Sequence, residues 1–248
     1  MSSFCRKKSL ELALISEIAY KSKEDIAREF EALEHRFFSG ESTQAVAVVY
    51  SDEVIVAFRG TQQLADLKRD FDYKKEESLL GSVHRGFYAA LREVLGEIIE
   101  YIEPHIEKKK LYVTGHSLGG ALAVLLGAYV KNTMSADVEI YTFGQPRVFG
   151  KASAAHMEEL IGGKLFRVVL DKDPIARVPS FVQGFSHIGR VQFFDGDGTL
   201  HIDASYWKRL MLIAYELGMS YFGGKSFLSV AKGIAKNHRI YDYISAIR

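Results

Sequence analysis

The sequence predicts an α/β fold with a mostly parallel central sheet and helices on both faces. Short apolar or β-branched runs alternate with helical patterns through the middle of the chain, which is typical of parallel sheets. A Gly-rich turn at residues 115–120 joins one such run directly to an apolar helical pattern. Hairpin signals precede and follow this alternation, so we expect antiparallel strands at both ends of the sheet. We expect residues 1–248 to form one domain, which is common at this length.

The N-terminal region is predicted to be helical over about the first forty residues. Leu10, Leu14 and Ile18 recur at helical spacing, and a similar pattern continues beyond them. Two β-branched runs follow at residues 44–50 and 54–58, separated by a short polar turn. This arrangement is typical of a β-hairpin, and we expect it to form one edge of the sheet.

The central region alternates between strands and helices. A long amphipathic helix is predicted at residues 86–103, ending before Pro104. The elements that follow are predicted strands at residues 111–114, 138–143 and 165–170 and predicted helices at 121–131 and 152–160. Residues 191–194 and 200–202 flank a polar turn and predict a second hairpin, and the tail from residue 205 is mostly helical in pattern.

Composition excludes several classes of protein. With one cysteine in 248 residues, the chain cannot form an internal disulfide framework or a Cys-rich zinc site. A formal net charge of +1 indicates no nucleic-acid partner, which would require a basic face. Glu11 and Glu17 interrupt the only stretch that could be a signal peptide, and the apolar run at 210–222 is shorter than the ~20 residues of a membrane span. We therefore expect a soluble protein, either cytoplasmic or a mature or non-classically secreted form.

A candidate nucleophile lies in the Gly-rich turn. Residues 115–119 read GHSLG, which fits the nucleophile-elbow pattern G-x-S-x-G centred on Ser117. A serine at a sharp strand-to-helix turn presents its hydroxyl to the cleft, and the helix N-terminus behind it stabilises a developing negative charge. The alternative is a Gly-rich turn without chemistry, but the strand before it and the small-residue helix after it favour the elbow.

A serine nucleophile needs a base that a third group orients, and the acid and the histidine follow the serine in this type of fold. Asp171 and Asp173 come directly after a predicted strand, so either would lie at the same sheet edge as the elbow. The histidines after the elbow are His156, His187, His201 and His238. His156 lies in a predicted helix and is expected at the surface, whereas chain order leaves the other three open.

Five blocks of the chain, in order, resemble the fungal-type, or class 3, lipase family of α/β-hydrolases. The blocks are VIVAFRGT at 54–61, VHRGF at 83–87, VTGHSLGGALA at 113–123, YTFGQPRV at 141–148 and DPIARVP at 173–179. Together they extend over about residues 42–190. His238, followed by Tyr241 and Tyr243, is similar to the family's C-terminal histidine with an aromatic residue a few positions later.

The resemblance implies an α/β-hydrolase fold and a catalytic triad. It implies a nucleophile, an orienting acid and a base, which are Ser117, Asp173 and His238. The backbone N–H groups of Thr61 and Leu118 would form the oxyanion hole, with Asp70 holding the Thr61 side chain. His84 and His187 fall at positions that are structural in the family.

The activity that the resemblance implies is hydrolysis of carboxylic esters, most simply by a lipase acting on acylglycerols at a lipid–water interface. This chemistry requires neither a metal nor an organic cofactor. A phospholipase and a feruloyl-type esterase remain alternatives, because pocket shape sets the preference for acyl group and alcohol. A lipase-like lipid-binding or signalling module without catalysis is the alternative from another class.

Residues 62–73 lie where members of the family often carry a lid. Leu64, Leu67 and Phe71 fall on one helical face, and in a lid that face would cover the site and contact substrate. A plain surface helix is the alternative.

Two further segments have an ordinary and a functional interpretation. The apolar segment at residues 205–236 suits an acyl pocket or a membrane-facing surface, but core packing of a terminal helix pair is favoured. The sequence DGDG at residues 195–198 could suggest calcium, but a hairpin turn explains it with fewer assumptions.

Overall fold

The computed structural model describes residues 3–31, 33–60, 74–171, 173–204 and 238–248. Its largest feature is an eight-stranded sheet with the order β1-β2-β3-β6-β7-β9-β11-β12. These strands are β1 Glu34–Ser39, β2 Gln44–Val49, β3 Glu53–Phe58, β6 Lys110–His116, β7 Val138–Phe143, β9 Leu165–Leu170, β11 Arg190–Phe194 and β12 Leu200–Ile202. The strands from β3 to β11 pair in parallel, whereas β1-β2, β2-β3 and β11-β12 pair antiparallel. The predicted parallel centre with antiparallel edges is confirmed.

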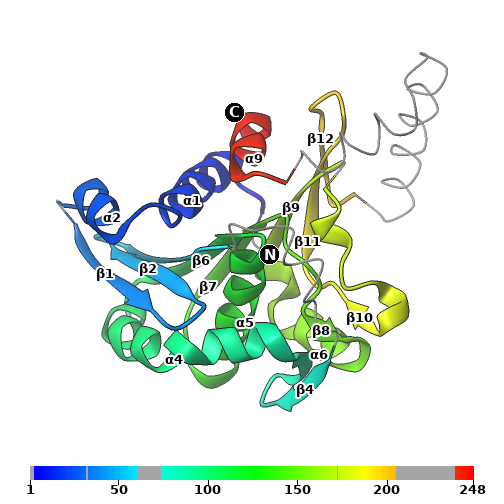
Figure 1. Cartoon of the computed structure of the whole chain (residues 1–248), viewed down its shortest axis with the longest axis horizontal. Helices are drawn as coiled ribbons and strands as arrows, with labels where there is room; N and C mark the ends of the chain where they lie inside the picture. The colour runs from blue at the N-terminus through cyan, green and yellow to red at the C-terminus, as the bar shows by residue number, and fades with distance from the viewer. Residues whose placement is uncertain (1–2, 32, 61–73, 172, 205–237) are drawn as a thin grey trace.

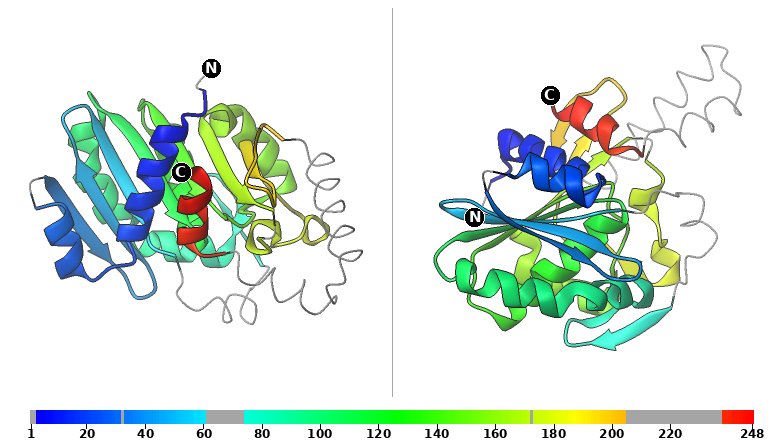
Figure 2. Two further views of the ribbon diagram at one scale, coloured as in Figure 1. Left: turned by 90° about the horizontal axis from the view of Figure 1, so that it is seen from above. Right: turned by 60° about the vertical axis from the view of Figure 1, so that its left-hand side comes forward.

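Helices cover both faces of this sheet, as Figure 1 shows. They are α1 Arg6–Ile18, α2 Lys23–Glu29, α4 Arg85–Ile106, α5 Leu118–Thr133, α6 Lys151–Ile161 and α9 Ile240–Ile247. The N-terminal α1 and the C-terminal α9 lie side by side on one face, while α4, α5 and α6 lie on the other (Figure 2). The two ends of the chain therefore contribute to the same hydrophobic layer.

The helices on the second face pack closely because of their sequences. In α5 nearly every side chain is small or apolar and most are buried, so this helix packs directly on β6 and β7. A Cβ on Gly127 would lie 2.3 Å from Ile140 Cδ1, so a larger residue there would force α5 away from the sheet. In α4, which packs on α5, Leu91, Val94 and Ile98 are buried at helical spacing while charged residues face water.

A small second sheet lies beside the main one and was not predicted from the sequence. Its order is β10-β8-β5-β4, and its strands are β4 Lys75–Ser78, β5 Gly81–His84, β8 Phe149–Gly150 and β10 Phe185–Ser186. Strands of two to four residues carry too little alternation for a sequence pattern to reveal them. This sheet leads directly into α4, where His84 caps the helix by accepting a hydrogen bond from the Phe87 backbone.

Two sequence predictions about element bounds are wrong. The predicted N-terminal helical region ends earlier, because residues Glu34–Ser39 form β1 and pair with β2 across a tight turn in which Gly40 N–H donates to Thr43 O. Phe38 is buried in this pairing, so tertiary contacts determine the strand. Helix α4 also continues through Pro104 to Ile106, because a proline in the last turn removes only one helical hydrogen bond.

The parallel strands determine where the candidate residues lie. Gly60 follows β3, Ser117 follows β6, Gly144 follows β7 and Asp173 comes three residues after β9. Because these four strands are neighbours in parallel register, all four loops emerge at the same edge of the sheet. Ligands bind at the carboxyl edge of such sheets, and the candidate residues are therefore gathered there.

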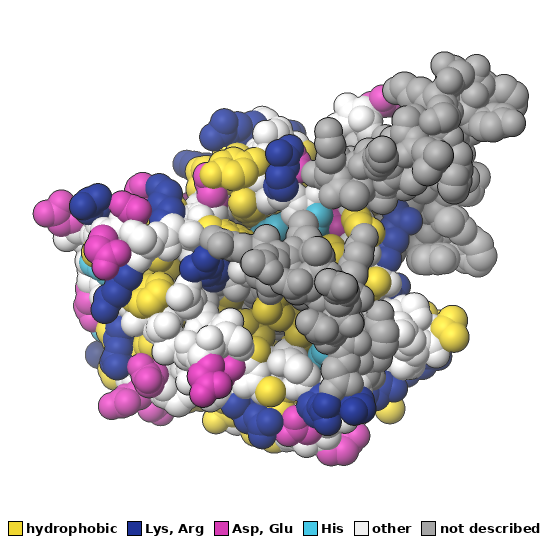
Figure 3. Space-filling model, in the orientation of Figure 1, with side chains coloured by type: hydrophobic (Ala, Val, Ile, Leu, Met, Phe, Trp, Pro, Cys, Tyr) yellow, Lys and Arg dark blue, Asp and Glu magenta, His cyan; other side chains and the backbone are white. Residues whose placement is uncertain are grey.

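Among the described residues, no helix is both long and apolar enough to cross a bilayer. On the face shown in Figure 3, acidic and basic side chains are interspersed with hydrophobic ones among the described residues. The predicted lid at 62–73 and the apolar segment at 205–236 lie outside the described residues.

Candidate active site

Ser117 occupies a strained turn between β6 and α5. Its backbone has φ 59° and ψ −125°, a positive-φ conformation that residues other than glycine rarely adopt. Its N–H donates to Phe143 O at 2.9 Å, which ties the turn to the end of β7. The Oγ atom is buried and has no hydrogen-bond partner among the described residues. This is the geometry expected of the nucleophile elbow.

The two glycines of the elbow are required by close backbone contacts. A Cβ on Gly115 would lie 2.3 Å from the backbone of Gly119, and a Cβ on Gly119 would lie 2.3 Å from Phe58 O in β3. Neither site can hold a side chain without moving backbone. The G-x-S-x-G spacing therefore follows from how tightly α5 approaches β6 and β3.

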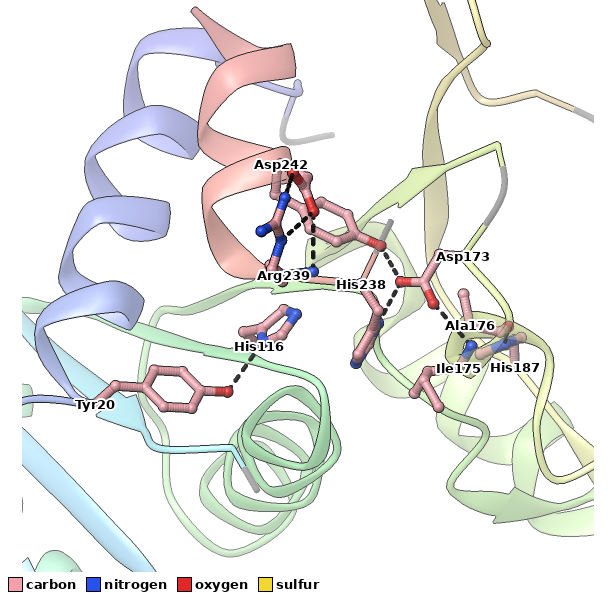
Figure 4. Close-up of polar contacts among 10 residues, drawn as sticks. Tyr20, His116, Asp173, Ile175, Ala176, His187, His238, Arg239 and Asp242 are labelled. Atoms are coloured by element: carbon pink, nitrogen blue, oxygen red, sulfur yellow. Dashed lines mark hydrogen bonds and ion pairs between the residues drawn. The ribbon is translucent and has the colours of Figure 1, made fainter. Parts of the chain in front are cut away.

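Asp173 and His238 form a buried pair next to this turn, although 65 residues separate them in the chain. Asp173 Oδ2 accepts a hydrogen bond from His238 Nδ1 at 2.6 Å, and Oδ1 accepts one from Ile175 N–H at 2.8 Å (Figure 4). The Asp173 side chain is 0% exposed and that of His238 is 1% exposed. His238 Nε2 has no hydrogen-bond partner among the described residues, so this nitrogen is available to exchange a proton.

Tyr243, on α9, completes the surroundings of the Asp173 carboxylate. Its hydroxyl donates a short hydrogen bond to Asp173 Oδ2. Burial, together with the Asp173 charge, raises the pKa of the Tyr243 phenol well above its ordinary value. The phenol therefore stays protonated and keeps donating, so the carboxylate has one partner from its own loop and two from the C-terminal segment.

Gly144 packs directly against this cluster. Its φ is +62°, and an added Cβ would lie 2.5 Å from Asp173 Oδ2, 2.8 Å from Tyr243 Oη and 2.9 Å from His238 Cε1. The glycine is thus needed both for its backbone conformation and for the space that the acid and the histidine occupy.

The N-terminus of α5 supplies a hydrogen-bond donor beside Ser117. Leu118 is the first residue of the helix, and helix geometry leaves its N–H without an intrahelical acceptor. A cavity of about 290 Å³ opens here. It is lined by Gly40, Glu41, Ser42, Thr43, Gln44, Arg59, Gly60 and Leu118. The Leu118 N–H therefore lies at the helix end that follows Ser117 and at the edge of this cavity.

The structure separates the other candidates from this cluster. His201 pairs with Asp195 on the β11–β12 hairpin, and His187 Nε2 bonds to Ala176 O. His156 is exposed on α6. Of the two aspartates considered, Asp173 is the one that bonds to His238.

Several predicted site residues lie outside the described part of the chain. They are Thr61, Leu64, Leu67, Asp70 and Phe71. The possible calcium segment at 195–198 forms a turn in which Asp195 accepts hydrogen bonds from the N–H groups of Asp197 and Thr199. In the described residues no group of His, Cys, Asp and Glu is arranged to hold a metal ion.

Comparison with known families decides which family this site belongs to. The model of the family described as lipase (class 3) matches residues 55–183, which include the elbow and Asp173. The chain belongs to the class 3 lipase family. It is 31% identical over 150 residues to a secreted mono- and diacylglycerol lipase of Fusarium solani, and the match covers 58% of this chain and 44% of that relative.

Other relatives and solved structures agree with this assignment. A triacylglycerol lipase of Nicotiana tabacum is 33% identical over 180 residues, covering 67% of this chain and 28% of that protein. The chain spans less than half the length of both curated relatives. The triacylglyceride lipase of Rhizomucor miehei superposes with a TM-score of 0.67 at 21% identity, covering 82% of this chain and 85% of the other. A lipase of Rhizopus microsporus var. chinensis gives 0.66 at 22% identity, covering 77% and 75%. The fold is the α/β-hydrolase fold that the resemblance implies.

Sequence reasoning did not assign a role to three residues of this candidate site. Gly144, Tyr243 and His116 all contact His238 or its acid partner. The sequence carries a signal for Tyr243, which is an aromatic residue shortly after His238, and for Gly144, which lies in the turn after a predicted strand. His116 was hidden because it is an unspecified position of the G-x-S-x-G pattern.

Proposed function

We propose that this protein is a serine carboxylic-ester hydrolase, most specifically a lipase that cleaves acylglycerols through an acyl-enzyme on Ser117. The observation that carries the proposal is the buried Asp173–His238 pair at the sheet edge where Ser117 occupies a strained strand-to-helix turn. The family and its lipase relatives support the same chemistry.

In the proposed mechanism His238 Nε2 takes the proton of the Ser117 hydroxyl as the oxygen attacks the ester carbonyl. Asp173, which accepts a hydrogen bond from the Tyr243 hydroxyl, orients the ring so that Nδ1 carries a proton and Nε2 can accept one. The negative oxygen of the tetrahedral intermediate is stabilised by the Leu118 N–H, with Thr61 proposed as the second donor. Collapse expels the alcohol, which takes the proton from His238. Water then repeats the two steps and releases the fatty acid.

A hydrolysis profile tests this proposal. Short p-nitrophenyl esters, a feruloyl ester, a triglyceride emulsion, diacylglycerol and phospholipid vesicles are compared at equal molar ester. We expect acylglycerols to be cleaved faster than phospholipid, and Ser117→Ala to lower kcat by about 10⁴-fold or more. A profile dominated by phospholipid or by feruloyl esters would replace the proposed substrate. Activity that Ser117→Ala fully retains would refute the proposed nucleophile.

We propose that the substrate is presented at a lipid–water interface and that residues 62–73 cover the site as a lid. The support is the apolar face formed by Leu64, Leu67 and Phe71 in the sequence. Leu67→Asp should then lower activity on emulsified ester more than on a soluble short-chain ester. Equal losses on both substrates would contradict a lid. We also propose that the whole chain forms one domain, because α9 packs on α1.

A further inference from the structure

A second histidine lies against the proposed base. The ring of His116, which directly precedes Ser117, packs against the ring of His238 in a tilted arrangement, with centroids 4.6 Å apart and planes inclined by 34°. The Tyr243 ring meets His116 edge-on with centroids 5.8 Å apart. His238 is therefore held through Nδ1 by Asp173 and along one ring face by His116. The proposed chemistry assigns His116 no proton transfer.

His116 is itself held by Tyr20, which lies just after the C-terminal end of α1. Tyr20 Oη and His116 Nδ1 share a hydrogen bond of 2.8 Å, drawn in Figure 4. His116 is only 5% exposed, and its Nε2 has no hydrogen-bond partner among the described residues. Tyr20 is thus a polar side-chain partner that holds the His116 ring where it packs against His238.

Tyr20 also contacts the loop on the other side of the elbow. A Cβ on Gly60 would lie 2.2 Å from Tyr20 Oη and 2.5 Å from His116 O. Gly60 directly precedes Thr61, the proposed oxyanion donor. One tyrosine hydroxyl therefore touches both the residue before the proposed nucleophile and the residue before that donor.

Charge in this cluster favours a neutral His116. Burial lowers the pKa of the His116 imidazole well below its ordinary value, and the His238 imidazole lowers it further, against an opposing effect of the His238 backbone. Burial raises the pKa of Tyr20, opposed by the Gly60 backbone and the Arg59 charge. A neutral ring can pack against His238 without adding a second positive charge when His238 becomes protonated.

We propose that Tyr20 and His116 are positioning residues, in which the Tyr20 hydroxyl fixes the His116 ring as the surface that holds His238 in line between Asp173 and Ser117. This inference rests on the proposed esterase function. It adds that the ring face of His116, not proton transfer by it, is what the reaction requires. An aromatic replacement should therefore work where a small one does not.

The test compares His116→Phe, His116→Ala and Tyr20→Phe with wild type and with His156→Ala, whose histidine is exposed on α6. On a soluble p-nitrophenyl ester, His116→Ala should lower kcat/KM by about 30- to 100-fold with KM nearly unchanged, because misplacement by about 1 Å costs that much. Its acid limb should move to higher pH, because water that enters beside His238 stabilises the imidazolium. His116→Phe should recover most of the rate with an unshifted limb, Tyr20→Phe should lose about threefold to tenfold, and His156→Ala should match wild type.

A spectroscopic readout decides the inference even if the protein cleaves no ester. The low-field proton signal of the His238 Nδ1–H bonded to Asp173, identified by its loss in His238→Ala, should persist in His116→Phe and broaden or vanish in His116→Ala. If His116→Ala does not fold, Tyr20→Phe should broaden the same signal. An unchanged signal in the folded His116→Ala or Tyr20→Phe variant would overturn the inference. So would an active wild type whose His116→Ala variant stays within twofold in kcat/KM with an unshifted acid limb. A wild type without esterase activity whose signal behaves as expected would refute only the proposed function.

Discussion

Two aspartate–histidine pairs in this molecule have the same contact distance and different surroundings. Asp173 and His238 approach to 2.6 Å with side chains that are 0% and 1% exposed, whereas Asp195 and His201 approach to 2.6 Å at 12% and 16% exposure. The first pair lies at the carboxyl edge of the parallel sheet near Ser117. The second closes the β11–β12 hairpin.

The difference shows that an aspartate–histidine contact alone does not make a candidate catalytic site. Asp195 Oδ1 accepts hydrogen bonds from N–H groups of its own turn, so this carboxylate stabilises the local backbone. Asp173 instead accepts a hydrogen bond from the Tyr243 hydroxyl on α9, and its histidine has a buried Nε2 and a second imidazole ring packed against it. Burial and these distant partners distinguish the two pairs, and the matched variants below test that distinction.

Removing each histidine should give the largest contrast. His238→Ala removes the proposed base and should lower kcat/KM on a soluble ester by about 10⁵- to 10⁶-fold. His201→Ala should leave kcat/KM within about twofold, because the Asp195–His201 pair closes the β11–β12 hairpin and has no part in the proposed chemistry. Steady-state kinetics of both purified variants provide the measurement. Comparable losses in the two variants would remove the distinction between the pairs.

Neutralising each aspartate should also give different values of kcat for the two pairs, but by a smaller factor than removing the histidines. Asp173→Asn preserves shape but no longer stabilises the protonated imidazole, so we expect kcat to fall about 10⁴-fold. Asp195→Asn should leave kcat unchanged. The same ester assay checks both, and a fully active Asp173→Asn would show that another acid orients His238.

Two glycines with positive φ extend the comparison to the backbone. An added Cβ at Gly144 would overlap Asp173, Tyr243 and His238, whereas at Gly198, in the hairpin turn, it would meet nothing within 4 Å. Gly144→Ala should displace the acid and the histidine and lower kcat/KM about 100-fold. Gly198→Ala carries only the backbone strain, about 1 kcal/mol, and should keep wild-type activity. If Gly144→Ala matches Gly198→Ala in activity, the close packing around Asp173 is not needed for the reaction.

Tyr243→Phe and Tyr241→Phe test the hydroxyl that only the buried pair receives. Losing a hydrogen bond to a buried carboxylate should lower the free energy of unfolding by about 1.5–3 kcal/mol and kcat by about tenfold. Tyr241 is 61% exposed, so its variant should change neither quantity. Denaturant unfolding and ester kinetics measure both, and an unaltered Tyr243→Phe protein would contradict the positioning of Asp173 by this phenol.

The smallest effect concerns the pH dependence of the hairpin pair. Burial raises the pKa of the Asp195 carboxyl, but the hydrogen bonds from His201 and from the N–H groups of Thr199 and Asp197 lower it by more. The pKa of Asp195 is therefore below its usual value of 3.8. A lowered folded-state pKa contributes stability that is present above the unfolded-state pKa and is lost as pH falls through the folded-state pKa. Wild type should therefore exceed Asp195→Asn in stability by at most ~1 kcal/mol at pH 7 and by nothing at acid pH. A stability difference between wild type and Asp195→Asn that grows toward acid pH would contradict a lowered pKa of Asp195.

Local sequence patterns predict the central strands of the sheet well, but they do not predict the edge strand β1. The bounds of β7 and β9 match their prediction to the residue, because each is a short, mostly apolar run between clear turns. The strand β1 was missed because only its pairing with β2 shows that Glu34–Ser39 is extended. Local periodicity carries no information about such contacts.

The candidate site likewise has a part that local sequence predicts and a part that depends on long-range contacts. The Ser117 elbow is predictable because its glycines, strand and helix are adjacent in sequence. The choice of His238 over His187 and His201 could not come from spacing, because its bond to Asp173 spans 65 residues, and only the family resemblance indicated it. The Tyr20–His116 bond spans 96 residues and gives no local signal.

Covalent labelling of Ser117 tests the central claim most directly. Folded protein is treated with a p-nitrophenyl phosphonate ester, and the adduct is located by peptide mass spectrometry. We expect one adduct, on Ser117, forming at the same rate in wild type and His201→Ala and at least about 1,000-fold more slowly in His238→Ala. No adduct on Ser117 in the folded wild-type protein, or an equal labelling rate in His238→Ala, would contradict the assignment of Ser117 and His238 as nucleophile and base.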